Sequence, residues 1–166
     1  MKPYAFVVTL LAGLCSVGTV SAASIELDGI GLSQEVPCGG KDVNITGSEN
    51  RIRLTGSCGA VVVYGTDHVV TLATASSLEV SGIQHNVVAD SVERLTVDTN
   101  KNGVRTAVAG HGRPATVEVL GAEHELDLRF EGPVTVALDG IDSRLQWSGD
   151  EPSLSSSGSG NEVEQR

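Results

Sequence analysis

Aromatic and basic residues are both scarce in this chain of 166 residues. Aromatic side chains make up 3% of the sequence, which is too few for the stacking platform that usually holds single-stranded nucleic acid or sugar rings. Lysine and arginine number 11 against 21 aspartates and glutamates, so the formal net charge is −10. A chain this acidic offers no basic stripe for phosphate groups. We therefore expect it to bind neither nucleic acid nor anionic membrane surfaces.

Long apolar runs are missing after the N-terminal segment, and this excludes a retained membrane span. The N-terminal segment itself carries Lys2, an almost wholly apolar stretch over residues 5–17, and the small-residue motif Val20-Ser21-Ala22. That order is typical of an export signal peptide that is cleaved. We therefore predict that residues 1–22 are a signal peptide and that the mature protein is periplasmic or secreted.

Cysteine is also rare. Removal of the signal peptide takes away Cys15 and leaves Cys38 and Cys58. In an exported chain, two cysteines most often form a disulfide, because the compartment is oxidising. The sequence therefore predicts a Cys38–Cys58 disulfide.

The sequence does contain a repeat, which occurs six times between Val43 and Trp147. It reads apolar-x-apolar-x-Gly-x-x-Asn/His-x-apolar-x-apolar, and its glycine position recurs every 17 to 22 residues. That position holds Gly47, Gly65, Gly82, Thr99, Gly121 and Gly140. Glycine suits a sharp corner because it adopts positive φ without steric cost. Where Thr99 replaces it, we expect a neighbouring Asn or Gly to take the left-handed conformation instead.

The residues on both sides of the corner alternate between apolar and polar, as half-buried strands do. Of the 24 apolar positions in the six repeats, 23 hold an apolar residue. The first arms are Val43/Ile45, Val61/Val63, Leu78/Val80, Leu95/Val97, Val117/Val119 and Val136/Leu138. The second arms are Ile52/Leu54, Val70/Leu72, Val87/Ala89, Val104/Thr106, Leu126/Leu128 and Leu145/Trp147.

These arms predict an all-β fold, a right-handed parallel β-solenoid (β-helix) of about six short coils. An antiparallel sandwich also has short strands separated by turns. Reversing hairpins would, however, gain nothing from an identical corner in every unit, whereas parallel coiling stacks equal positions into ladders. Stacked coils would also bring Cys38 and Cys58 within disulfide reach.

The predicted solenoid domain covers residues 24–147. We expect it to begin with a short apolar cap made of Ile25, Leu27, Ile30 and Leu32. Residues 148–166 are rich in serine, glycine and acidic residues, so we expect a disordered tail. Trp147 would then lie over the last open coil. The stretch 107–116 contains glycine and proline and predicts one sizeable loop between two coils.

Three segments together resemble a bacterial family called domain of unknown function 3060. They are Cys38-Gly-Gly, the run from Asn44 to Asn50, and the run from Leu54 to Cys58. The resemblance covers residues 24–110 well and the rest loosely. It implies an exported protein with this Gly-x-x-Asn repeat and paired cysteines, and it implies no established activity or catalytic residue. Histidines at 68 and 85 depart from the asparagine usual in the family.

His68, His85 and His124 occupy the Asn/His position of three repeats, the first two in adjacent coils. Imidazole suits zinc, copper and nickel. A closed site takes about four ligands, however, and the same position in neighbouring coils offers Asn50 and Asn102. The other interpretation is that these are corner residues bonded to the backbone. We expect no metal site and no cofactor, with a metal-binding His68/His85 column as the alternative.

Outward-facing charged residues do not form a catalytic cluster in the repeat. The candidates lie at different positions in different coils: Glu79, Glu93, Asp98, Glu118, Asp127 and Arg129. β-Helix enzymes that cleave acidic polysaccharides instead gather carboxylate and basic residues on one wall. We therefore predict no enzyme, and a polysaccharide-active enzyme is a weaker alternative.

The repeat explains its own recurrent residues by packing and turn geometry, and this leaves surface contact as the predicted function. We expect an exported, non-catalytic structural or interaction protein of the cell envelope. Its partner would be an unknown envelope protein or glycan, and a glycan-binding module is a further alternative. The candidate contact segments are the Gly110-His111-Gly112-Arg113 loop and the acidic tail.

Overall fold

The computed structural model describes residues 24–166, so the predicted signal peptide lies outside the described residues. Over this range the elements are fourteen strands, and the strand pairings are parallel. No helix in this range is long and apolar enough to cross a membrane. The strands wind into a β-solenoid of about eight turns, which confirms the predicted fold class.

Each coil contributes one strand to each of two walls. The first wall contains β1 (Ile25–Ile30), β3 (Val43–Ser48), β7 (Arg94–Asn100), β9 (Ala115–Ala122), β11 (Val134–Ile141) and β13 (Ser153–Ser159). The second wall contains β2 (Ser33–Pro37), β6 (Asn86–Val92), β8 (Gly103–Ala109), β10 (Glu125–Glu131), β12 (Arg144–Gly149) and β14 (Glu162–Gln165). Two longer strands, β4 (Arg51–Thr66) and β5 (Val69–Ile83), begin in the second wall and end in the first.

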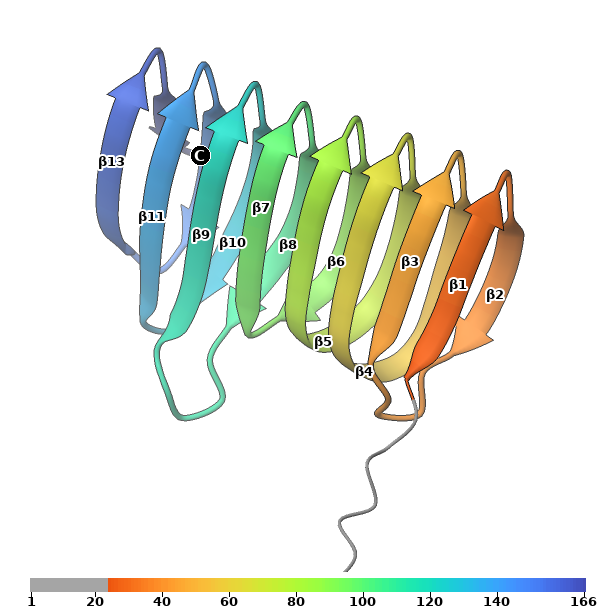
Figure 1. The fold of residues 1–166 in the computed structure, drawn as a ribbon. Helices are drawn as coiled ribbons and strands as arrows, with labels where there is room; N and C mark the ends of the chain where they lie inside the picture. The colour runs from red at the N-terminus through yellow and green to blue at the C-terminus, as the bar shows by residue number, and fades with distance from the viewer. Residues whose placement is uncertain (1–23) are drawn as a thin grey trace, which may run out of the picture.

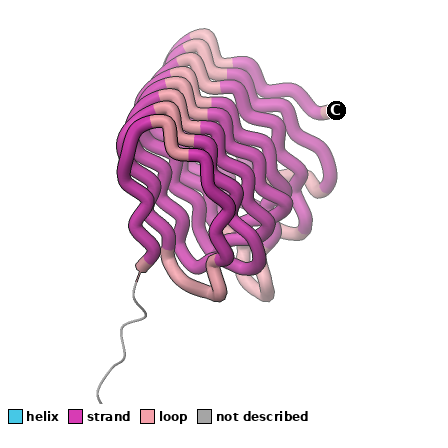
Figure 2. The backbone as a smooth tube through the Cα atoms, turned by 90° about the vertical axis from the view of Figure 1, so that its right-hand side faces the viewer, coloured by secondary structure: helices cyan, strands magenta, loops and turns pink. Residues whose placement is uncertain are grey.

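The chain runs along the first wall, turns through the Gly-x-x-Asn/His segment, and returns along the second wall (Figure 1). We call this turn the glycine corner, and the turn at the opposite end of the walls the return corner. The winding is right-handed, and Figure 2 shows the glycine corners of successive coils stacked in a row. The register keeps equal positions in contact: Val43 lies opposite Val61, and Val61 lies opposite Leu78.

The core confirms the apolar pattern of the sequence. All 24 arm positions predicted to point inward are buried, including Thr106, which is 4% exposed. A further apolar column follows the second wall into the return corner, and it was not predicted. Its in-register members are Cys58, Ala75, Val92, Val108 and Phe130. This column closes the side of the core that the repeat motif leaves open.

The prediction of about six coils is too low, because a further coil lies at each end. The predicted cap is the first coil: β1 pairs in register with β3, and Gly29 lies opposite Gly47. The prediction of a disordered tail over residues 148–166 is wrong for the same reason. β13 pairs with β11 and β14 with β12, and Gly158 lies opposite Gly140. An end coil touches one neighbour and buries less surface, so polar residues such as Gln34 and Ser156 are tolerated there.

Trp147 also differs from its prediction. Its side chain is 8% exposed and stacks on Phe130, with ring centroids 5.8 Å apart. Its strand pairs with β14, where Trp147 lies opposite Gln165. Trp147 is therefore a core residue of the seventh coil and does not cover the end of the stack.

Most glycine corners contain two residues at positive φ where the sequence predicted one, and the corners at Gly29 and Gly140 contain one. Gly65, for example, has φ of 132°, and Asp67 two residues later has φ of 56°. Thr99 corrects another expectation, because it takes the left-handed conformation itself, with φ of 79°. Its neighbours do not replace it, since the stacked coils fix the backbone at each position.

Candidate functional site

The Asn/His position of the repeat forms one polar column inside the solenoid. Its members are Asn50, His68, His85, Asn102, His124, Ser143 and Asn161. At each step the backbone N–H of one member donates to a side-chain nitrogen or oxygen of the next coil, over 3.0–3.2 Å. These bonds satisfy corner amides that would otherwise be buried without a partner.

The other end of each histidine ring faces a backbone carbonyl four residues earlier. Nε2 of His68, His85 and His124 lies 3.1, 3.1 and 2.7 Å from the carbonyl oxygens of Tyr64, Ser81 and Leu120. Nδ1 accepts and Nε2 donates, so each ring is the neutral Nε2–H tautomer. Asn50 makes the same pair of contacts. Its Oδ1 accepts from the backbone N–H of Leu32, and its Nδ2 donates to the carbonyl oxygen of Thr46, four residues earlier.

Electrostatics favour the neutral ring that these contacts need. Burial lowers the pKa of His85, and repulsion from His68 lowers it further; the two rings stack with centroids 4.9 Å apart. Burial also lowers the pKa of His124. A protonated ring would turn an N–H toward the backbone N–H that now donates to it. Protonation of His85 or His124 would therefore weaken the column.

These contacts argue against the metal alternative. Both nitrogens of His68 and of His85 already have hydrogen-bond partners inside the protein. In the part of the chain that the structure describes, no three His, Cys, Asp or Glu side chains are grouped so that they could hold a metal ion. The column therefore acts as a structural element of the corner.

The predicted cysteine pair lies at disulfide distance. The Cα atoms of Cys38 and Cys58 are 4.9 Å apart, and the two sulfur atoms are bonded. Both residues lie in return corners, one before and one after the second coil. The bond joins the N-terminal end of the stack to the coil above it, where the solenoid has fewest neighbours.

Two of the outward carboxylates, Asp127 and Glu93, make ion pairs in different parts of the surface. Asp127 on the second wall bridges two arginines, with its Oδ2 3.0 Å from Arg105 and 3.2 Å from Arg166. Glu93 lies elsewhere, at the return corner, with its Oε1 3.1 Å from His111 Nδ1. These two carboxylates therefore belong to separate parts of the surface.

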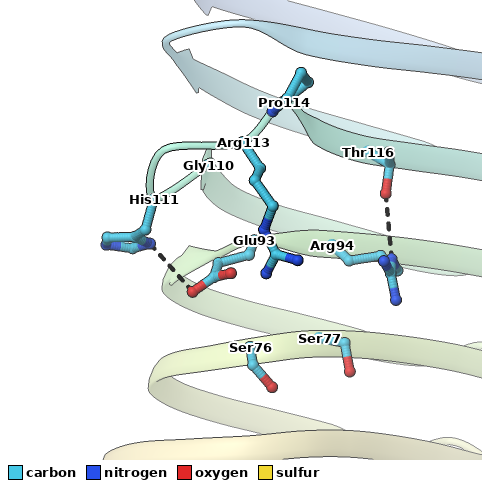
Figure 3. Close-up of a pocket in the computed structure, with 9 residues that line it drawn as sticks. All are labelled: Ser76, Ser77, Glu93, Arg94, Gly110, His111, Arg113, Pro114 and Thr116. Atoms are coloured by element: carbon cyan, nitrogen blue, oxygen red, sulfur yellow. Dashed lines mark hydrogen bonds and ion pairs between the residues drawn. The ribbon is translucent and has the colours of Figure 1, made fainter.

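The loop predicted between two coils is residues 110–114, between β8 and β9, and it projects beyond the return corners (Figure 1). It overhangs a recess of about 280 Å³ (Figure 3). The loop side is lined by Gly110, His111, Arg113 and Pro114, and the wall side by Ser76, Ser77, Glu93, Arg94 and Thr116. This recess interrupts the regular surface of the repeat.

Stacking determines which side chains face the recess. Arg94 lies opposite Thr116 in the sheet, and its Nε donates to Thr116 Oγ1 over 3.3 Å. Ser77 precedes the next matched pair, Leu78 and Leu95, so it lies one coil further along the same line. In Figure 3, Arg113 reaches from the loop toward the coil that carries Glu93 and Arg94. The sequence indicated the loop and did not indicate Ser76, Ser77, Arg94 or Thr116.

Comparison with known proteins gives one partial family match and no activity. Residues 45–83 match the family described as Protein of unknown function (DUF3060). This confirms the resemblance over the second to fourth coils, a shorter stretch than the expected 24–110. No curated protein and no solved structure matches the chain. The function must therefore be argued from the chain's own surface.

Proposed function

We propose that this protein is an exported, non-catalytic β-solenoid that acts through surface contact with a protein or glycan of the cell envelope. The Cys38–Cys58 pair supports export, because disulfides persist in oxidising compartments. The export pattern in residues 1–22 points to the same compartment.

One observation carries the proposal: the recurrent polar residues of the repeat make hydrogen bonds inside the fold. Within residues 24–166, no buried side-chain nitrogen or oxygen lacks a hydrogen-bond partner. An active site usually keeps polar groups free for its substrate. The feature that the repeat does not explain is the loop at residues 110–114 with its recess, which supports contact at that place.

Co-sedimentation with isolated envelope material tests the proposal. The purified exported protein is mixed with protein-free envelope polysaccharide and, separately, with protein-containing envelope fractions. We expect retention by one fraction, loss of retention when residues 110–113 are replaced by four serines, and recovery of any bound glycan at unchanged chain length. Gln84→Asn, at an exposed glycine corner on the opposite side, is the matched control. Equal retention of the loop variant, or a shortened glycan, would overturn the proposal.

The metal alternative has its own test. Calorimetric titration with zinc, copper and nickel should give no stoichiometric binding at micromolar strength, because the ring nitrogens of His68 and His85 are already hydrogen-bonded. Micromolar binding that disappears in the His68→Ala/His85→Ala variant would instead establish a metal-binding module.

A further inference from the structure

The recess under the 110–114 loop differs from the rest of the surface in its charge. Most lysines and arginines between residues 24 and 166 pair with a carboxylate, as Arg53, Arg105 and Arg144 do. Arg94 and Arg113 have no carboxylate within ion-pair distance in this range, and both line the recess. Two guanidinium groups without a carboxylate partner among residues 24–166 face the same hollow in a protein of net charge −10.

Guanidinium groups recognise oxyanions. Each presents a planar fork of N–H donors that matches a carboxylate or a phosphate. Arg94 uses Nε on Thr116, and its terminal nitrogens have no hydrogen-bond partner among residues 24–166. The bond to Thr116 also fixes the direction of the Arg94 side chain, which lowers the entropy lost when a ligand binds.

The remaining lining suits a ligand rich in hydroxyl groups. Ser76 and Ser77 place two hydroxyls below the arginines (Figure 3). Glu93 contacts His111 through Oε1, and its second oxygen can accept a hydrogen bond from a ligand. A second recess, of about 410 Å³, adjoins the first and shares Ser76, Glu93 and His111 with it. Its lining adds the hydroxyls of Ser57, Thr74 and Ser91.

The net charge of the whole molecule restricts the ligand further. A densely charged polyanion would be repelled by the acidic protein surface at every position outside the recess. An isolated acidic group on an otherwise neutral chain would meet the two arginines without that repulsion. An acidic peptide fits less well, since Pro114 is the one apolar side chain lining the first recess.

We propose that the recess under the 110–114 loop binds a saccharide carrying an isolated carboxylate or phosphate, whose oxyanion is held by Arg94 and Arg113. The sugar hydroxyls bond to Ser76, Ser77 and Glu93, and neighbouring sugar units extend over the second recess. This inference rests on the proposed surface-contact function and names its ligand class. No Phe, Tyr or Trp among residues 24–166 lines either recess, so binding depends on charge and hydrogen bonds and is weakened by salt.

The test is an NMR titration of the purified protein with its disulfide intact. Glucuronic acid and glucose 6-phosphate separate a carboxylate from a phosphate, glucose is the neutral control, and a short glutamate-containing peptide tests the peptide alternative. We expect saturable shifts of the amides of Arg94, His111 and Thr116 with one acidic sugar, and a dissociation constant at least tenfold weaker in Arg94→Ala/Arg113→Ala.

A matched control removes the same charge elsewhere. Lys41 and Arg51 are exposed and also lack a carboxylate partner in the described range, so Lys41→Ala/Arg51→Ala should leave binding within about twofold. Circular dichroism confirms that both variants fold. Equal binding of glucose, tighter binding of the peptide, equal loss in the control variant, or no saturation with either acidic sugar would overturn the inference. Envelope retention that depends on the loop would still stand in that case, which separates this inference from the proposed function.

Discussion

At Gly65 and Gly121, the backbone of the neighbouring coil lies so close that a Cβ does not fit. A Cβ added at Gly65 would lie 2.1 Å from the carbonyl oxygen of Gly47, and one at Gly121 would lie 2.1 Å from that of Thr99. Positive φ adds strain of about 1–3 kcal/mol for other residues. Both causes act together at Gly65, whose φ is 132°.

Gly65→Ala is therefore expected to lower the free energy of unfolding by more than about 3 kcal/mol, because the strand must move away from its neighbour. Urea denaturation followed by Trp147 fluorescence measures the change. Gly56→Ala is the control: φ there is 76°, but nothing lies within 4 Å of an added Cβ, so only the conformational strain remains. Equal losses in the two variants would show that the close approach of the coils does not matter.

At the scale of the element, the polar column and the disulfide hold the coils in register. The column is a chain of bonds from one coil to the next, and its histidines make the contacts that asparagine makes elsewhere in the same column. Because the rings are neutral in the fold, the column connects the stability of the solenoid to pH.

The pH dependence has a definite sign. An unfolded histidine has a pKa of about 6.5, and burial lowers the pKa of His85 and of His124 in the fold. As the pH falls below about 6.5, the unfolded chain binds protons that the folded chain does not, so stability decreases. Each histidine contributes a slope of at most about 1.4 kcal/mol per pH unit. Urea denaturation at pH 5.0 to 7.5 should show this loss.

His85→Asn/His124→Asn supplies the control, since asparagine occupies the same column at Asn50 and Asn102. This variant should fold and lose most of the slope between pH 5.0 and 6.5. An unchanged slope would mean that other groups cause the acid sensitivity.

The disulfide should matter most at the N-terminal end of the stack. Cys38 and Cys58 are 20 residues apart, and closing a loop of that size adds roughly 3 kcal/mol in the chain-entropy model. Cys38→Ser/Cys58→Ser should lower stability by about that amount and raise hydrogen exchange in β1 and β2 before the later coils. Mass spectrometry of exported protein should find no free thiol at either position, and two free thiols would contradict the assignment.

At the scale of the whole molecule, the protein is a stack in which each coil touches its neighbours alone. The strand order of each wall follows the order of the coils, and residues distant in sequence meet through stacking. Stability in such a stack is close to a sum of coil and interface contributions. The loss of an end coil should then leave the remaining coils folded.

Deletion of residues 150–166 tests this expectation. It removes β13 and β14, and we expect the far-ultraviolet circular dichroism to keep its strand signal with almost no helix, at reduced stability. Trp147 would lose the strand opposite it, so its fluorescence should shift to longer wavelength. A variant that unfolds entirely would show that the last coil is required by all the others.

The sequence alone predicted the interior of the solenoid, because alternation and a constant corner are local signals. Val43 and Val61 show the same pattern whatever their neighbours do, and apart from the buried Thr106 the pattern fails where burial decreases. Gln34, Ser156 and Gln165 hid the end coils for this reason, although Gly29 and Gly158 keep the 18-residue spacing from Gly47 and Gly140.

Tertiary structure decided the rest. The left-handed residue two positions after the corner glycine position, such as Glu49 or Lys101, has no residue-type signal, because the stacked backbone imposes its φ. The bonding of both nitrogens in His68 and His85 depends on the distance between coils, which the local sequence does not encode. The recess joins Ser77, Arg94 and Arg113 from three separate parts of the chain. Their proximity arises from the parallel stacking of the coils together with one inserted loop. The local sequence encodes neither the spacing of the coils nor the position of the loop over them.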